Sequence, residues 1–235
     1  MKIARFSKRV SPFDEGYDSS HEFPGHFQDK EQEEIRLVHS VFLVPGNNAA
    51  RIAVFSGVTS NTGCHMLCCR AGETLASLVG GSVCLVDANL RSPSLHKYFE
   101  VSNLKGLTEA VFQSGPIKQF AQRVRGNNLW LLSCGFHQVD PEPFLSSQSL
   151  CARIGELRVA FDHVLIAAAP ATSFSDAALL GRLSDGVVLV IEANSTRREP
   201  ALKAKENLEA AGVKLLGAIL NNRTFPIPET IYKKL

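Results

Sequence analysis

Six short apolar segments, separated by longer stretches of helical spacing, constrain the fold of this chain more than any other feature. The apolar segments begin at Arg51, Val83, Leu129, His163, Gly186 and Lys214. Each is apolar at consecutive positions, as a strand must be when both faces of its sheet are covered. The helical stretches lie at 64–79, 106–113, 146–160, 174–183 and 199–211. This alternation predicts an α/β fold with a doubly wound, mostly parallel sheet.

The length of 235 residues, 45% of them hydrophobic, suits a single α/β domain with a sizeable core. We expect this domain to span residues 31–235, because Ile35, Val38 and Phe42 begin a helical pattern there. Residues 1–30 are polar, contain Pro and Gly, and show no apolar period. They are predicted to form a mobile N-terminal arm.

Charge and hydropathy exclude several classes of partner. Basic residues number 25 and acidic residues 23, so the net charge of +2 indicates no nucleic-acid partner. No uninterrupted apolar run approaches the roughly 20 residues of a membrane span, and the N-terminus has no apolar signal segment. We therefore expect a cytoplasmic protein whose six cysteines are reduced thiols.

The loop after the first predicted strand, residues 56–63, consists of small residues and runs directly into a helix. Backbone amides and a helix N-terminus together form a cradle for phosphate. In a working cradle the last Gly is followed by a Lys, which neutralises phosphate oxygens, and a Ser or Thr, which binds Mg²⁺. Here Gly63 is kept, but Cys64 stands in place of the Lys and His65 in place of the hydroxyl residue.

The segment after the second predicted strand, VCLVDANLRSPSLHKYF (83–99), supplies a more specific pattern. It resembles the Walker A′ segment of the bacterial P-loop tyrosine kinases that control capsule and exopolysaccharide assembly, Asp-x-Asp-Leu-Arg-x-Pro-x-Leu-His. Further matches to that family follow in order at Gly106–Thr108, Phe161–Ile166, Ser175–Ala177, Asp185–Gly186 and Leu220–Arg223. The resemblance runs from about Glu31 to the end of the chain and implies a P-loop NTPase-like fold.

The resemblance also implies a set of site residues. The positions that would bind nucleotide are Gly63, Cys64, His65, Asp87, Asn89, Arg91 and Asn221. Asp87 would be the catalytic residue if the chain is active, and no metal ligands are assigned. Asn221 matches the residue that contacts the base, or it serves a turn at the end of a strand. The family's second Walker A′ Asp is Asn89 here, and Ala167 replaces the Walker B Asp.

These replacements lead to a functional prediction. Losing the Lys and the metal together should weaken nucleotide binding by roughly 10²–10⁴-fold. Phosphoryl transfer should suffer more, because it depends on charge stabilisation. We predict a degenerate tyrosine-kinase-like protein, a pseudokinase, that acts in exopolysaccharide or capsule biosynthesis through protein binding, with only weak binding of ATP or ADP with Mg²⁺. The alternative is an active, autophosphorylating tyrosine kinase. A partition-type ATPase is disfavoured, because Thr59 stands where its early Lys would be.

The resemblance implies partners as well. These are a membrane-anchored polysaccharide chain-length regulator or an active kinase relative, which would place the protein at the cytoplasmic face of the inner membrane. Glu33 and Arg36 resemble a helix that carries subunit contacts in ring-shaped homo-oligomers, although His39 replaces its last Arg. The C-terminal segment holds one tyrosine, Tyr232, instead of the tyrosine-rich cluster of active members.

Three cysteines near the cradle allow another interpretation. Cys68 and Cys69 can replace small buried residues of the helix, because a free Cys behaves as a small hydrophobe. Cys64 lies at a helix N-terminus, where a thiol is expected to have a lowered pKa and to react readily. A redox-sensing role, or a metal site that includes His65, is therefore the minor alternative.

Overall fold

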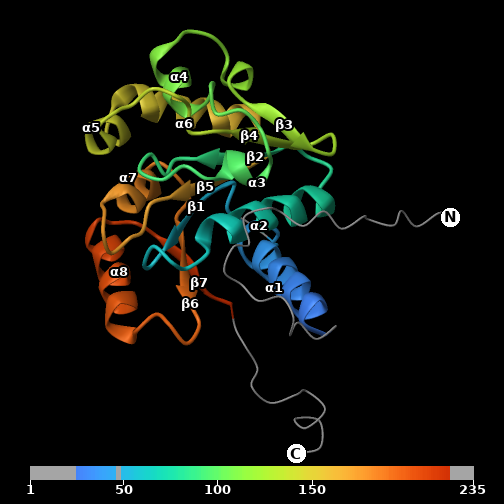
Figure 1. Cartoon of the computed structure of the whole chain (residues 1–235), viewed down its shortest axis with the longest axis vertical. Helices are drawn as coiled ribbons and strands as arrows, with labels where there is room; N and C mark the ends of the chain where they lie inside the picture. Colours follow the sequence, from blue (N-terminus) through green and yellow to red (C-terminus); the bar gives the residue numbers. More distant parts are fainter. Residues whose placement is uncertain (1–24, 46–48, 223–235) are drawn as a thin grey trace, which may run out of the picture.

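The sheet has seven strands in the order β3-β4-β2-β5-β1-β6-β7 in the computed structural model, which describes residues 25–45 and 49–222 (Figure 1). The strands are β1 (Ile52–Gly57), β2 (Val83–Asp87), β3 (Gln122–Arg125), β4 (Leu129–Leu132), β5 (His163–Ala168), β6 (Val187–Glu192) and β7 (Leu215–Asn221). Only the β3–β4 pair is antiparallel among these neighbours. The predicted doubly wound, mostly parallel sheet is confirmed.

Both faces of the central strands are buried, which explains their continuous apolar runs. Every residue of β1 and β2 is buried. Along β1, Ile52 and Val54 pack into one core cluster, whereas Ala53 and Phe55 pack into the other. Successive side chains of a strand point to opposite faces, so one strand supplies both layers.

Helices cover both faces. The longer helices are α1 (Gly25–Phe42), α2 (Cys64–Leu78), α6 (Gln148–Ala160), α7 (Asp176–Arg182) and α8 (Arg198–Ala210). The shorter ones are α3 (Leu95–Tyr98), α4 (Leu107–Phe112), the 3₁₀ helix η2 (Ile117–Gln119) and α5 (Pro141–Leu145). Buried residues of α1, α2 and α3 belong to one core cluster, and those of α4 to α8 belong to the other. Among the described residues, no helix is long and apolar enough to span a membrane.

Helix α1 begins six residues before the predicted domain start at Glu31. The rest of the predicted arm, residues 1–24, lies outside the described residues, as do Tyr17 and Tyr232. Arg36 and His39 are exposed on α1. The homo-oligomer predicted through Glu33 and Arg36 stays a prediction.

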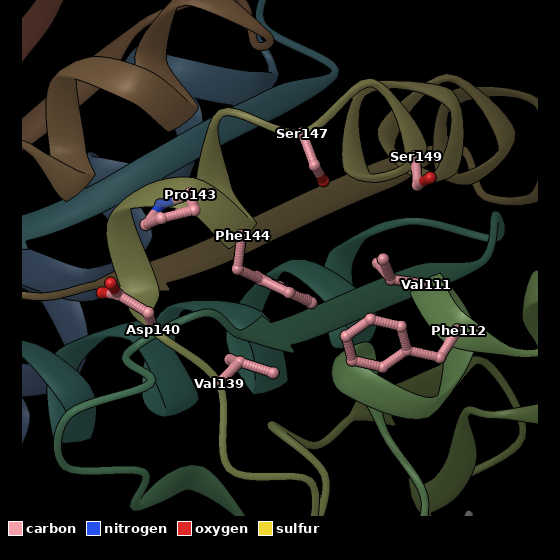
Figure 2. A pocket seen from close by; sticks show the side chains of 8 residues that line it. All are labelled: Val111, Phe112, Val139, Asp140, Pro143, Phe144, Ser147 and Ser149. Atoms are coloured by element: carbon pink, nitrogen blue, oxygen red, sulfur yellow. The ribbon is translucent and has the colours of Figure 1, made fainter.

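Four elements were not predicted from the sequence: α3, η2, β3 and α5. Strand β3 alternates half-buried and exposed residues at the sheet edge, and α5 starts with a proline at its first turn. The predicted helix 146–160 begins later, at Gln148, because the hydroxyl of Ser147 caps it by accepting from the Leu150 amide (3.2 Å). An apolar groove of about 370 Å³ is lined by residues of α4 and α5 (Figure 2).

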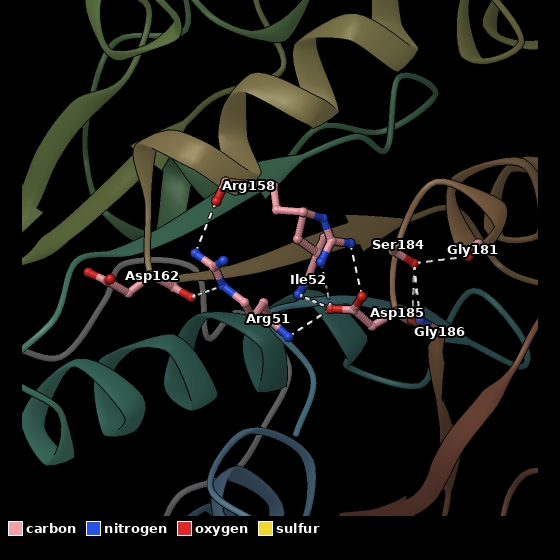
Figure 3. Close-up of polar contacts among 8 residues, drawn as sticks. All are labelled: Arg51, Ile52, Arg158, Asp162, Gly181, Ser184, Asp185 and Gly186. Atoms are coloured by element: carbon pink, nitrogen blue, oxygen red, sulfur yellow. Dashed lines mark hydrogen bonds and ion pairs between the residues drawn. The ribbon is translucent and has the colours of Figure 1, made fainter. Parts of the chain in front are cut away.

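A polar network ties together the amino ends of β1, β5 and β6 (Figure 3). The Asp185 carboxylate accepts from the backbone amides of Arg51 (2.7 Å) and Ile52 (2.8 Å) and pairs with Arg158 (2.9 Å). The Arg51 guanidinium donates to the carbonyl of Arg158 (3.0 Å). Burial raises the pKa of Asp185, but the bonds from Arg158 and the two amides outweigh it and lower the pKa below its ordinary value. The network holds together the amino ends of these strands, at the end of the sheet opposite the candidate site.

Candidate functional site

The loop after β1 closes on Gly63, whose backbone is left-handed (φ 63°, ψ 20°), and α2 starts at the next residue. The Asn221 side chain, at the end of β7, donates from Nδ2 to the Thr62 carbonyl (2.8 Å). A Cβ atom on Gly63 would lie 2.8 Å from that same Nδ2 atom. Glycine is therefore required both by the backbone conformation and by the close approach of Asn221. This contact positions the loop, and the predicted contact of Asn221 with the base stays a prediction.

The carboxyl ends of β1, β2 and β5 meet at this loop. The Ala88 amide donates to the Ala167 carbonyl (2.9 Å), and the buried Ser56 hydroxyl donates to the Ala169 carbonyl (2.7 Å). The three ends enclose a cavity of about 40 Å³, whose lining includes Cys64, His65, Asn89 and Ala167. The four positions at which the chain departs from the kinase pattern thus surround one cavity.

The volume of this cavity limits what it can hold. One water needs roughly 10–15 Å³ of such volume, whereas ligand pockets usually measure about 300–1,000 Å³. A cavity of about 40 Å³ can take a few waters or one phosphoryl-sized group. A whole nucleotide would need to lie outside it or to displace its walls.

Asp87, at the end of β2, is completely buried. Its Oδ2 atom accepts from the backbone amides of Ser94 (2.8 Å) and Leu95 (2.9 Å), and its Oδ1 atom accepts from the Asn89 amide (3.3 Å). Burial raises the pKa of Asp87 to about 6, although these three amides oppose the shift. The carboxylate holds the loop between β2 and α3.

Neither His65 nor Arg91 replaces the missing Lys. Partial burial lowers the pKa of His65, and Arg70 acts in the same direction, so the imidazole is mostly neutral at pH 7. Arg91 is engaged elsewhere. Its guanidinium lies 3.9 Å from the ring centroid of Phe174 and pairs with the buried Asp176 (3.4 Å).

The lowered pKa expected for the Cys64 thiol at the helix N-terminus is contradicted, whereas the redox-sensing role itself stays a prediction. Burial raises the pKa of Cys64 to about 12, and a hydrogen bond from the Gly57 backbone only partly opposes it. Burial also raises the pKa of Cys68 and Cys69, and both side chains are completely buried. Desolvation therefore dominates over the helix dipole here. Within the described ranges, no group of three or more His, Cys, Asp or Glu side chains is arranged to hold a metal ion.

A second polar cluster was not predicted from the sequence. The buried Glu109 of α4 accepts at Oε1 from His137 Nδ1 (2.6 Å) and from the backbone amides of Phe136 (2.9 Å) and His137 (3.2 Å). Burial raises the pKa of Glu109, but these bonds, led by that of His137, lower it overall. The two side chains are 28 residues apart in the sequence, and no local pattern joins them.

Comparison with known proteins bears on the family. The chain is 37% identical over 144 residues to the tyrosine-protein kinase YwqD of Bacillus subtilis, a match that covers 61% of each chain. The chain is therefore similar to proteins named as bacterial tyrosine kinases. The tyrosine-protein kinase CpsD of Streptococcus agalactiae is 29% identical over 143 residues, 60% of this chain and 62% of CpsD. These matches span less than two thirds of either relative. No family model matches the chain.

Solved structures confirm the fold. The crystal structure of the chimerical protein CapA2B2 superposes with a TM-score of 0.73 over 83% of this chain and 82% of that one, at 22% identity. At this identity the likeness concerns the fold alone. The expected P-loop NTPase-like fold is therefore confirmed, and the resemblance noted in the sequence is borne out by the named relatives.

Proposed function

We propose that this protein is a catalytically degenerate relative of the tyrosine kinases that acts in exopolysaccharide or capsule biosynthesis by binding other proteins. One observation carries the proposal. Cys64, His65, Asn89 and Ala167, which replace the groups that bind phosphate and metal, line a single cavity of about 40 Å³. The replacements therefore remove the phosphate-binding and metal-binding groups from one site together.

The side chains at the kinase pattern's metal positions offer few free oxygen atoms for a magnesium–nucleotide complex. Mg²⁺ demands oxygen ligands in near-octahedral geometry. Asp87 already accepts three backbone hydrogen bonds, and Asn89 Oδ1 accepts from the Ser92 amide (3.3 Å). Ala167 offers no side-chain oxygen. Binding Mg²⁺ through Asp87 would compete with the bonds that hold its own loop.

The charge around the cavity supports the same proposal. A triphosphate brings several negative charges, and P-loop enzymes offset them with Lys and a metal. Here His65 is mostly neutral and Arg91 is paired, so the amides and dipole of α2, together with the charge of Lys97, supply the attraction. That attraction fits weak binding of a phosphate group. It would not stabilise the charge that develops when a phosphoryl group is transferred to an acceptor.

A second candidate function, an active tyrosine kinase, is favoured by Asp87 itself. A carboxylate with a pKa of about 6 is well matched to accept a proton from a substrate hydroxyl near neutral pH. Complete burial of the side chain weighs against this role, because a general base must reach the proton that it removes.

Protein partners would then carry the function. The implied partners are a membrane-anchored chain-length regulator or an active kinase relative, and the protein would bind them at the cytoplasmic face of the membrane. The relatives named as tyrosine kinases support a place in the same assembly system. The intact sheet and helices support a protein that is maintained as a folded binding surface.

Complementation in the source organism tests this proposal. Deleting the gene should lower the yield of cell-bound or secreted polysaccharide, and a copy with Asp87→Asn should restore it fully, because the amide keeps the shape of the side chain without its charge. A copy with Arg36→Glu tests the surface of α1 in parallel. Restoration by the wild type but not by Asp87→Asn, with equal protein levels, would favour the active kinase instead. An unchanged yield after deletion would refute the role in polysaccharide assembly.

A further inference from the structure

The groove between α4 and α5 is apolar on its floor and walls. Phe112 and Phe144 point toward one another with ring centroids 6.0 Å apart, and Val111, Val139 and Pro143 add to the apolar lining (Figure 2). Asp140, Ser147 and Ser149 also line the groove. Phe144 is buried, whereas Phe112 is 60% exposed. A half-open aromatic groove of about 370 Å³ is large enough for one or two side chains. It leaves apolar surface in water unless something covers it.

An oriented imidazole stands beside the groove. The ring centroid of His137 lies 5.8 Å from that of Phe112. The Glu109 carboxylate can only accept, so His137 Nδ1 must carry the hydrogen of their 2.6 Å bond. In the neutral ring, Nε2 is then a hydrogen-bond acceptor. A ligand that places an aromatic ring in the groove and a hydroxyl near its edge would satisfy both features, as a tyrosine does.

The rim of the groove is acidic. Asp140 lines it, and Glu142 follows on α5. Both residues are exposed, and neither carboxylate has an ion-pair partner within residues 25–45 and 49–222. A segment that carries positive charge next to its tyrosine would therefore complement the groove in charge as well as in shape.

We propose that the groove binds the C-terminal segment of the same chain, Ile231–Leu235. Its sequence is Ile-Tyr-Lys-Lys-Leu, which places two lysines directly after Tyr232. The Tyr232 ring packs against the pair formed by Phe112 and Phe144, its hydroxyl donates to His137 Nε2, and Lys233 and Lys234 face Asp140 and Glu142. The proposal is independent of the nucleotide site and of the proposed function.

The segment is long enough to reach the groove. Tyr232 follows Asn222 by ten residues, which can span at most about 33–36 Å when extended. Helix α5, which lines the groove, follows β4 in the chain, and β4 is five strand positions from β7 in the sheet. At about 4.8 Å per position the lateral distance is about 24 Å. Because β4 and β7 run in the same direction, their carboxyl ends lie at the same end of the sheet.

Backbone amide NMR spectra of the full chain test the proposal. Tyr232→Ala should shift the amide signals of Phe112, Val139 and Phe144 relative to the wild type. Tyr232→Phe, which keeps the ring and removes the hydroxyl, should shift chiefly the signals of His137. Thr230→Ser, in the same segment, is the matched control and should leave the groove signals unchanged.

Two further spectra complete the test. In a Phe112→Ser background, adding Tyr232→Ala should no longer shift Val139 and Phe144, because the site is already lost. The wild-type spectrum should also be unchanged on tenfold dilution, since the contact lies within one chain. Groove signals that do not respond to Tyr232→Ala would overturn the proposal. Shifts that disappear on dilution would overturn it in favour of a second copy of the chain.

Discussion

Asp87 combines two properties that the sequence alone does not reveal together. Its position after a buried strand and its place in the Walker A′ pattern mark it as a site residue. The structure adds that it is completely buried and holds the amides of Ser94 and Leu95. Because desolvation outweighs these bonds, the charged form is disfavoured. The residue is therefore costly to keep ionised at neutral pH.

This cost predicts a pH dependence of stability. The folded pKa of about 6 lies above the ordinary value of 3.8, so the folded state is favoured by protonation. The stabilisation is complete below pH 3.8 and is lost as the pH rises through 6, in total by about 3 kcal/mol. The Asp87→Asn substitution removes this pH-dependent contribution to stability. Urea unfolding at pH 4 and pH 7 should show the variant gaining up to about 3 kcal/mol relative to the wild type over that interval. If the free energy of unfolding differed between variant and wild type by the same amount at both pH values, the predicted cost of burying the ionised Asp87 would be contradicted.

Other residues show where sequence reasoning stops. The grouping of Cys64, His65, Asn89 and Ala167 around one cavity could be predicted, because strand order brings their loops together. The pKa of Cys64 could not be predicted, because it depends on how the folded chain buries the thiol rather than on its position at the helix N-terminus. The pair of Glu109 and His137 left no signal, since its members come from separate elements.

At the scale of elements, the central strands were predictable because both of their faces are buried. Strand β3 was not, because its sequence Gln-Arg-Val-Arg has no apolar run. Its charged side chains pack over rings instead: the guanidinium of Arg123 lies 4.8 Å from the Trp130 ring centroid, and that of Arg125 lies 5.8 Å from the Tyr98 ring centroid. Such edge strands depend on tertiary contacts that a local pattern does not contain.

The network at the amino ends of the strands gives a prediction at this scale. Asp185→Ala leaves the amides of Arg51 and Ile52 and the guanidinium of Arg158 without their acceptor. We expect a loss of roughly 2–4 kcal/mol in the free energy of unfolding at pH 7, measured by urea denaturation. The pKa of Asp185 is lowered, so its contribution is present above pH 3.8 and is lost as the pH falls through the folded value.

The control for this variant is Glu206→Ala, an exposed position on α8, which should change stability by less than about 0.5 kcal/mol. Equal effects of Asp185→Ala and Glu206→Ala would mean that the network contributes little. The bound Arg158 is more than a third exposed, which places the expected loss nearer the lower end of the range.

Across the whole molecule, polar side chains make different contacts at the amino ends and at the carboxyl ends of the strands. At the amino edge, Arg51, Arg158 and Asp185 form a satisfied network. At the carboxyl edge, Asp87 and Asn221 bind backbone groups of the site's own loops. In the function that we propose, these polar side chains stabilise the walls of the site instead of facing a ligand. The molecule would then keep the architecture of a P-loop protein without a charge arrangement suited to phosphoryl transfer.

Phosphoryl transfer from Mg²⁺–ATP tests this central claim most directly. Purified full-length protein is incubated with ATP labelled at the γ-phosphate, and the label bound to protein is followed over time. Asp87→Asn provides the background, because it lacks the carboxylate required for transfer in the alternative. The account predicts that the wild type incorporates label no faster than Asp87→Asn. Incorporation on tyrosine by the wild type that Asp87→Asn abolishes would contradict it and identify an active kinase.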